Sequence, residues 1–150
     1  MSTTEIYNFI EISTNVTSSG CLTDNDVDAL AKSDYQLVIN LLPNDSNKSL
    51  KNEQEKVEGK NIHYFYIPVD FSRPTDEDYA AFEVIMKKRK QRKTHIHCAA
   101  NWRASAFYAV YALKNSGWSA SQAGKFILSI WKPTDFEAWV EFLKRHGINL

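Results

Sequence analysis

The distribution of apolar and polar residues along the chain predicts four β-strands. Three segments are rich in β-branched and aromatic residues, and a fourth is short and alternating. They span residues 6–12, 36–42, 61–69 and 94–98. Short segments of this composition, bounded by turn-forming residues, are typical of strands in a packed sheet. Pro43-Asn44 ends the second segment, and Pro68 lies near the end of the third.

Helix signals are stronger, because apolar residues recur at helical spacing and several segments open with a capping residue. The expected helices begin at or directly after Thr23, Thr75, Arg103, Ser119 and Thr134. Asp26 completes a capping box with Thr23, and Asn115-Ser116-Gly117 ends the third helix. A shorter helix is expected within residues 50–58, inside a polar stretch that runs from 44 to 60.

Alternation of strands and helices favours an α/β fold. We expect a central, mostly parallel sheet flanked by helices, followed by a C-terminal helical tail. No internal repeat and no linker rich in Pro, Gly or Ser divides the 150 residues. The chain is therefore expected to form a single domain over residues 1–150.

Composition and charge exclude several classes of protein. Hydrophobic residues make up 43% of the chain, which is typical of a packed globular protein. Eighteen basic residues balance eighteen acidic ones, so the basic excess of a nucleic-acid-binding protein is missing. No apolar run approaches the roughly 20 residues of a membrane span, so no membrane partner is expected.

Two cysteines are too few for a disulfide framework, which indicates a reducing compartment, and we expect the cytoplasm. The first ten residues do not form a signal peptide, although a chain trimmed of an export signal would look the same.

One segment carries the chemistry: His97-Cys98-Ala99-Ala100-Asn101-Trp102-Arg103-Ala104-Ser105, between the last strand and the third helix. A helix start presents unpaired N–H groups and a positive dipole end, and inward-turned loop N–H groups can hold an anion. The same field favours the thiolate form of a cysteine. Arg103 adds a planar charged fork for a phosphate. Together these features predict a nucleophilic Cys98 beneath a tetrahedral oxyanion site, suited to phosphoryl transfer.

This segment resembles the signature loop of cysteine-dependent protein tyrosine and dual-specificity phosphatases. The whole chain is similar to a small bacterial phosphatase-like family, members of which are sometimes fused to metallo-β-lactamase-like hydrolases. The matching elements are Ser19-Gly20, Thr23, Val38-Ile39-Asn40-Leu41, Ile67-Pro68-Val69 and His97 to Arg103, so the resemblance covers residues 19–122. It implies a phosphatase-like fold without a cofactor, in which the loop holds the phosphate through Ala99, Ala100, Asn101, Trp102, Arg103 and Ala104.

The chain departs from this pattern at four positions. Four residues separate Cys98 from Arg103, where most tyrosine phosphatases have five. Asn101 replaces a glycine, and asparagine is the residue after glycine that best tolerates positive φ. Ala104 replaces the hydroxyl residue that helps the thiolate leave, and Ser105 follows one step later, which puts turnover in question. Leu42 stands where the family often has an arginine.

A phosphatase also needs an acid that protonates the leaving oxygen. The resemblance implies that Asp70, directly after Ile67-Pro68-Val69, holds the matching position. Asp76 and Asp78 compete for the role, but both fit the first turn of the helix after Pro74, where Asp78 can serve as a cap.

Several neighbouring residues have more than one interpretation. His97 is expected to support the loop through backbone hydrogen bonds. His95 shares its strand face and could bind a metal ion with it, but no third ligand stands at a signature spacing, so no metal ion is expected. Trp102 either stacks on an aromatic substrate or packs over the loop. Cys21 is expected to be a packed thiol. The basic run 87–93 is either an anionic docking patch or, more commonly, a helix C-terminus.

Three functions stay open. The leading one is a phosphatase that hydrolyses a phosphomonoester, such as phosphotyrosine, through a phosphocysteine on Cys98. The second is a rhodanese-type sulfurtransferase, which the four-residue spacing favours, although its Asp-x-Arg and Gly-His-Ile segments are missing. The third is a module that binds a phosphorylated ligand without turnover. The expected partner is a phosphorylated small molecule or phosphoprotein; the substrate and oligomeric state do not follow from the sequence.

Overall fold

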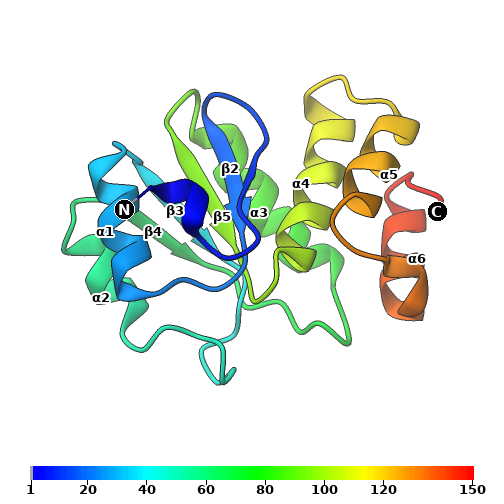
Figure 1. Ribbon diagram of the computed structural model, residues 1–150. Helices are drawn as coiled ribbons and strands as arrows, with labels where there is room; N and C mark the ends of the chain where they lie inside the picture. The colour runs from blue at the N-terminus through cyan, green and yellow to red at the C-terminus, as the bar shows by residue number, and fades with distance from the viewer. Residues whose placement is uncertain (1) are drawn as a thin grey trace.

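A five-stranded sheet forms the centre of the molecule in the computed structural model, which describes residues 2–150 (Figure 1). The strands are β1 (Ile10–Glu11), β2 (Val16–Ser19), β3 (Leu37–Asn40), β4 (His63–Tyr66) and β5 (Thr94–His97). Their order across the sheet is β1-β2-β5-β3-β4, and all adjacent pairs are parallel except β1 with β2. This arrangement confirms the predicted α/β fold with a mostly parallel sheet.

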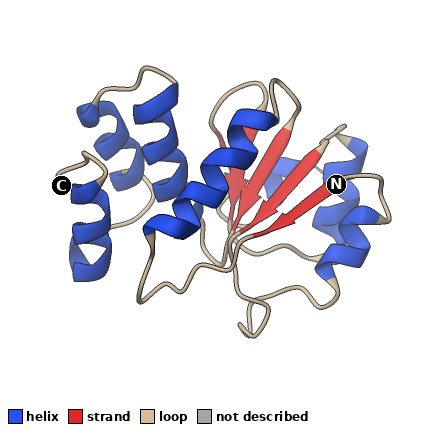
Figure 2. Cartoon of the chain, turned by 180° about the vertical axis from the view of Figure 1, so that it is seen from behind, coloured by secondary structure: helices blue, strands red, loops and turns tan. Residues whose placement is uncertain are grey.

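Helices cover both faces of the sheet, as the parallel strands require. They are α1 (Asp24–Lys32), α2 (Glu53–Glu58), α3 (Asp76–Lys88), α4 (Trp102–Asn115), α5 (Ala120–Leu128) and α6 (Glu137–Arg145), with short 3-10 turns η1 (Thr3–Glu5) and η2 (Pro133–Asp135). Two hydrophobic clusters result. Val38 packs with residues of α1 and α2 on one face, and Ile39 and Ile96 pack with α3 and α4 on the other. The view from behind shows α3 lying across the sheet (Figure 2).

The C-terminal helices form a separate layer beside the sheet. In Figure 1, α5 and α6 gather next to α4 and away from α1 and α2. Residues of α5 and α6, among them Ile127, Trp139, Phe142 and Leu143, join the larger of the two hydrophobic clusters through α4. The predicted helical tail is therefore part of the core rather than an appendage.

Capping residues located several helix starts correctly. Thr23 accepts a hydrogen bond from the N–H of Asp26, whose side chain accepts from the N–H of Thr23, so the predicted capping box is present. Thr75 and Ser119 also cap their helices through the side chain. At Thr75, the structure has only the bond from the Asp78 N–H to the Thr75 hydroxyl.

Other boundaries differ from the prediction. Only Ile10–Glu11 of the predicted strand 6–12 is a strand, because Ile6 is drawn into the core beside η1. The last helix begins at Glu137 rather than Thr134, since Pro133 starts a separate 3-10 turn. Strand β2 was not predicted; it contains only one apolar residue, Val16, yet all four of its residues are buried. No helix in residues 2–150 has the length and apolar character needed to cross a bilayer.

Candidate active site

Cys98 lies at the carboxyl end of β5, between β2 and β3, in the middle of the sheet. Its side chain is fully buried, and the chain turns sharply after it into α4. Asn101 occupies the turn with φ 72° and ψ 5°, in the left-handed region. The prediction that asparagine can replace glycine at this turn is thus confirmed.

The loop between Cys98 and Arg103 is held from outside by the segment 7–21. The amide of Asn8 donates to the carbonyl of Ala100, and the amide of Asn101 donates to the carbonyl of Asn8. The N–H of Cys21 donates to the carbonyl of Ala99. Gly20 makes this close approach possible, because a Cβ there would lie 2.6 Å from the Ala99 carbonyl oxygen. The carbonyls of Ala99 and Ala100 are therefore both bound by the segment 7–21, on the outer side of the loop.

The loop N–H groups, in contrast, have no partner in residues 2–150. None of the five N–H groups of Ala99, Ala100, Trp102, Arg103 and Ala104 donates to a protein acceptor. Three of them belong to the first turn of α4, where unpaired donors coincide with the positive end of the helix dipole. Unpaired donors next to a thiol form a cradle for an oxyanion.

A pocket opens beside Cys98. It has a volume of about 210 Å³ and is lined by Phe71, Cys98, Ala99, Ala100, Trp102 and Arg103. The size suits a phosphoryl group with part of its ester, and two aromatic side chains, Phe71 and Trp102, form part of the wall. The thiol, the cradle and the arginine, which the sequence predicted as one site, thus lie around one cavity.

Arg103 connects the loop with the segment after β4. One of its guanidinium nitrogens, Nη1, donates to the carbonyl of Val69 at 2.9 Å. Its Nε is buried and has no hydrogen-bond partner in the described part of the chain. The guanidinium lies 5.6 Å from the centre of the Phe71 ring. A buried donor without a partner is costly, and an oxyanion in the pocket would satisfy it.

Asp70 stands at the rim of the site with a fixed backbone. Its two neighbours are clamped through their carbonyls, Val69 by Arg103 and Phe71 by the indole N–H of Trp139 at 2.7 Å. The carboxyl group is exposed and lines a second pocket, of about 370 Å³, together with Asp45 and Arg103. The backbone thus presents this carboxyl at the edge of the site.

The carboxyl of Asp70 accepts two hydrogen bonds from Ser72, one from its hydroxyl and one from its N–H. These two bonds, the hydroxyl's first, hold the pKa of Asp70 below its usual range. The competing Asp76 is bound elsewhere, by His146 and Arg145 of the C-terminal segment.

The hydroxyl of Ser105, whose reach to the thiolate the sequence put in question, is engaged within α4. Ala104 is buried, and Ser105 donates its hydroxyl to the carbonyl of Trp102 at 3.0 Å within the first turn of α4. Leu42, at the position of a family arginine, is buried and lines the same pocket as Asp70. Arg103 is therefore the one arginine that lines either of these two pockets.

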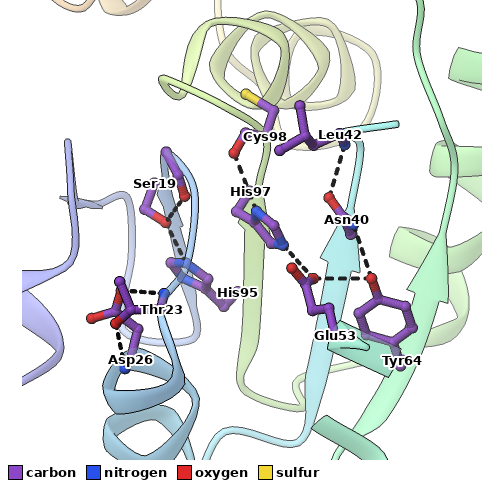
Figure 3. A network of polar contacts seen from close by, with 11 residues as sticks. Ser19, Thr23, Asp26, Asn40, Leu42, Glu53, Tyr64, His95, His97 and Cys98 are labelled. Atoms are coloured by element: carbon purple, nitrogen blue, oxygen red, sulfur yellow. Dashed lines mark hydrogen bonds and ion pairs between the residues drawn. The ribbon is translucent and has the colours of Figure 1, made fainter. Parts of the chain in front are cut away.

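His97 lies behind Cys98 and makes two contacts. Its Nδ1 donates to the carbonyl of Cys98 at 3.2 Å, as the expected support through the backbone requires. Its Nε2 faces Glu53 of α2 at 2.6 Å, a partner that the sequence did not indicate (Figure 3). In the same view, the sulfur of Cys98 points away from His97 toward the ribbon of the loop.

The remaining candidates have structural partners. His95 lies between the hydroxyls of Thr17 and Ser19, each at 2.7 Å. No cluster of metal-ligating side chains occurs among the described residues. Trp102 both lines the pocket and stacks on Trp131 at 5.2 Å, so it packs over the loop and also faces the site.

Three residues at the site carried no sequence signal. Phe71 follows Asp70 without any motif of its own, whereas Asp45 and Glu53 lie in the polar stretch 44–60. All three residues are too far from Cys98 in sequence to form a recognisable motif with it. Only the position of Asp45, just after the β3 end, could have suggested a place at the edge where Cys98 also lies.

Comparison with known proteins gives structural neighbours only. No family model matches the chain, and no curated protein matches it. A candidate phosphatase (DUF442) from Shewanella putrefaciens CN-32 superposes with a TM-score of 0.88 at 28% identity, covering 95% of this chain and 90% of that one.

Two more distant structures share the fold. P. aeruginosa TpbA, solved in complex with pTyr, gives a TM-score of 0.75 at 13% identity and covers 99% of this chain and 87% of its own. The core catalytic domain of PP-IP phosphatase SIW14 from S. cerevisiae gives a TM-score of 0.78 at 12% identity. The match covers 95% of this chain and 86% of that one. These neighbours are of the cysteine-based phosphatase fold, and the sheet and helices described above match it.

Proposed function

We propose that this chain is a cysteine-dependent phosphatase that hydrolyses a phosphomonoester through a phosphocysteine intermediate on Cys98. The observation that carries the proposal is the set of five loop N–H groups without a protein acceptor beside a buried thiol. The unpaired Nε of Arg103 adds a charged donor to this set. Such a set of donors stabilises the equatorial oxygens of a phosphoryl group as it is transferred.

In the first step, the thiolate of Cys98 attacks phosphorus and the bond between phosphorus and the ester oxygen breaks. Asp70 gives its proton to the departing oxygen. The dianionic phosphate beside Asp70 raises the pKa of this carboxyl relative to the free protein, because like charges disfavour ionisation. In the second step, a water molecule attacks phosphorus, its proton passes to Asp70, and the sulfur–phosphorus bond breaks to restore the thiolate.

The second step has less support from the side chains than the first. Ala104 offers no hydroxyl to the departing thiolate, and the hydroxyl of Ser105 is engaged by the carbonyl of Trp102. We therefore expect the phosphocysteine to accumulate, with a burst of product equal to the protein concentration before slow turnover.

The substrate is a phosphorylated small molecule or phosphoprotein. TpbA was solved with pTyr and SIW14 is a PP-IP phosphatase, which supports phosphorylated substrates in general. A reducing compartment such as the cytoplasm suits this chemistry, because both cysteines are free and a thiolate nucleophile is inactivated by oxidation.

Hydrolysis of p-nitrophenyl phosphate tests the proposal. We expect Cys98→Ser to abolish both the burst and the turnover, whereas the control Cys21→Ser keeps both. Activity of Cys98→Ser equal to that of the unmodified chain would contradict the nucleophile. Release of thiocyanate from thiosulfate and cyanide, without phosphate hydrolysis, would identify a sulfurtransferase instead.

A phosphate-binding module is the second candidate, and the turned-away hydroxyl of Ser105 favours it. Such a module would bind phosphotyrosine tightly and release no phosphate. A single-turnover experiment with excess protein separates the two, since only the enzyme forms free product or a phosphorylated Cys98.

A further inference from the structure

We propose that Glu53 is a positioning residue for this site, acting through His97 on the peptide group that joins Cys98 to Ala99. The inference deepens the proposed function and rests on it, because it assigns to Glu53 the orientation of one donor of the phosphate cradle. Glu53 belongs to α2, which lies 40 residues or more before the loop in sequence. Figure 3 shows the Glu53 carboxyl next to His97, on the side of the ring away from the Cys98 sulfur.

A directed chain of hydrogen bonds ends on Glu53. The N–H of Leu42 donates to Oδ1 of Asn40, which fixes the orientation of that amide. Nδ2 of Asn40 then donates to the hydroxyl of Tyr64 at 2.9 Å. Tyr64 in turn gives its proton to Oε2 of Glu53 at 2.9 Å. The carboxyl oxygen that faces His97 is thus already an acceptor, as expected for an ionised carboxylate.

His97 has an acceptor on each side of its ring. The carbonyl of Cys98 can only accept, so Nδ1 carries a proton. Nε2 lies 2.6 Å from the Glu53 carboxylate, so it also donates. We infer that the ring is an imidazolium paired with the Glu53 carboxylate; both side chains are almost fully buried, at 0% and 2% exposed. Because the pair is buried, the charge on each partner is stable only while the opposite charge is present.

Two titratable groups, Tyr64 and His95, face this pair in addition to Cys98. Tyr64 donates to Glu53, and burial together with the Glu53 charge raises the pKa of its hydroxyl. The ring of His95 stacks beside His97 at 6.5 Å between centroids. Burial lowers the pKa of His95 well below its ordinary value, and the neighbouring His97 lowers it further.

The peptide group between Cys98 and Ala99 connects the His97–Glu53 pair to the phosphate cradle. In a trans peptide the C=O and the next N–H point in opposite directions, and the structure holds no cis peptide in its described residues. His97 draws the Cys98 carbonyl toward itself, so the N–H of Ala99 points to the opposite side. That N–H has no protein acceptor and lies beside the pocket that Cys98 lines. Glu53 fixes the His97 ring and stabilises its positive charge. The ring in turn keeps the Ala99 N–H directed at the oxyanion site.

Burial distinguishes Glu53 from the other acidic residues of α2. Glu53 is buried, whereas Glu55 and Glu58 are exposed to solvent. A buried carboxylate is unfavourable unless it is paired, and here the pairing serves the loop rather than α2 itself. Glu55 is therefore a matched control, since it carries the same charge on the same short helix without reaching the site.

Alkylation of Cys98 by iodoacetamide tests the inference without any turnover. The experiment uses the Cys21→Ser background, so that one thiol reacts. We expect Glu53→Gln to slow alkylation at pH 6.5 at least about fivefold, because the thiolate loses a nearby cation and an oriented donor. At pH 10 the two rates should converge, since the thiol is then ionised in both proteins. Glu55→Gln should leave the rate unchanged at both pH values.

The ring nitrogen shifts of His97, measured by NMR at pH 7, provide a second readout. We expect both nitrogens to be protonated in the unmodified chain and one of them to lose its proton in Glu53→Gln. A neutral His97 in the unmodified chain would overturn the inference, whether or not the variant folds. If Glu53→Gln does not fold, Tyr64→Phe replaces it, and alkylation at pH 6.5 should slow about twofold because one donor to Glu53 is lost.

The outcomes separate this inference from the proposed function. Equal alkylation profiles for Glu53→Gln and Glu55→Gln, in a chain that hydrolyses p-nitrophenyl phosphate, would overturn the role of Glu53 alone. A slower profile for Glu53→Gln in a chain that hydrolyses no phosphate would support Glu53 and contradict the phosphatase.

Discussion

At the scale of single residues, Asp70 combines a fixed backbone with a side chain held in the ionised form. The carbonyls before and after it are clamped by Arg103 and Trp139. Its carboxylate accepts from the hydroxyl and the N–H of Ser72, and these bonds lower its pKa. A leaving-group acid must instead be protonated when substrate is bound. In the proposed mechanism, Ser72 therefore sets the pH above which Asp70 no longer protonates the leaving oxygen.

The variant Ser72→Ala should move the alkaline limb of the pH profile of the burst rate, which reports the complex with substrate, to higher pH. Removing the hydroxyl takes away the largest cause of the lowered pKa, so Asp70 keeps its proton at higher pH. The profile is measured with p-nitrophenyl phosphate between pH 4 and 9. As a control, Asp70→Asn should lower kcat about a hundredfold and remove this limb altogether. An unchanged limb in both variants would show that another group protonates the leaving oxygen.

At the scale of elements, β5 places two histidines on one face with different hydrogen-bond partners. His97 meets acceptors at both nitrogens, whereas His95 meets hydroxyls. Ser19 gives its own proton to the carbonyl of Gly20, so it accepts from Nε2 of His95, and Thr17 is left to donate to Nδ1. This bonding fits a neutral ring, in agreement with the lowered pKa of His95.

Protein stability should accordingly fall as the pH is lowered below 6.5, the ordinary value for His95. The unfolded chain takes up the proton near that pH, but the folded chain does so only at its lowered pKa. The contribution of neutral His95 is thus complete above pH 6.5 and is lost as the pH falls toward the folded pKa. The loss is expected to reach about 1.4 kcal/mol per pH unit.

Urea unfolding between pH 7 and 5 measures this dependence. The variant His95→Asn cannot titrate in this range, so its free energy of unfolding should change less with pH than that of the unmodified chain. Identical slopes for the two proteins would contradict the assignment of a neutral His95.

Strand β2 was not predicted from the sequence because its residues are mostly polar. Thr17 and Ser19 are buried because they bind His95, so the strand lacks the apolar pattern by which strands are predicted. By contrast, the Thr23 capping box and the spacing of Cys98 and Arg103 are local, and both were found from the sequence. Glu53 depends on a contact across 44 residues, for which no local signal exists.

At the scale of the whole molecule, the C-terminal helices complete the wall of the candidate active site. Phe71 contacts Trp131, Phe136 and Trp139, with ring centroids 5.0 to 5.8 Å apart. Trp131 lies just after α5, whereas Phe136 and Trp139 lie at the start of α6 or within it. The helical tail thus supports Phe71 and Trp102, the two aromatic side chains that line the pocket beside Cys98.

The same wall and the balance of charge around it favour a substrate with one phosphate and an aromatic group. The charged side chains that line the three pockets next to the loop are two cations, Arg103 and Lys48, and two anions, Asp45 and Asp70. Among the residues that line these pockets, cations therefore do not outnumber anions, and an excess of cations is what a polyphosphate would need. We therefore expect kcat/KM for p-nitrophenyl phosphate or phosphotyrosine to exceed that for inositol hexakisphosphate.

The variant Phe71→Leu tests whether the aromatic wall selects the substrate, since it keeps an apolar side chain but removes the ring. We expect kcat/KM for p-nitrophenyl phosphate to fall about three- to tenfold, as the loss of one aromatic contact implies, with methyl phosphate hydrolysis nearly unchanged. As a control, Phe126→Leu alters an aromatic residue that packs on Trp118, away from the pocket, and should leave the ratio of the two substrates unchanged. An equal loss for both substrates in Phe71→Leu would mean that Phe71 supports only the position of Asp70.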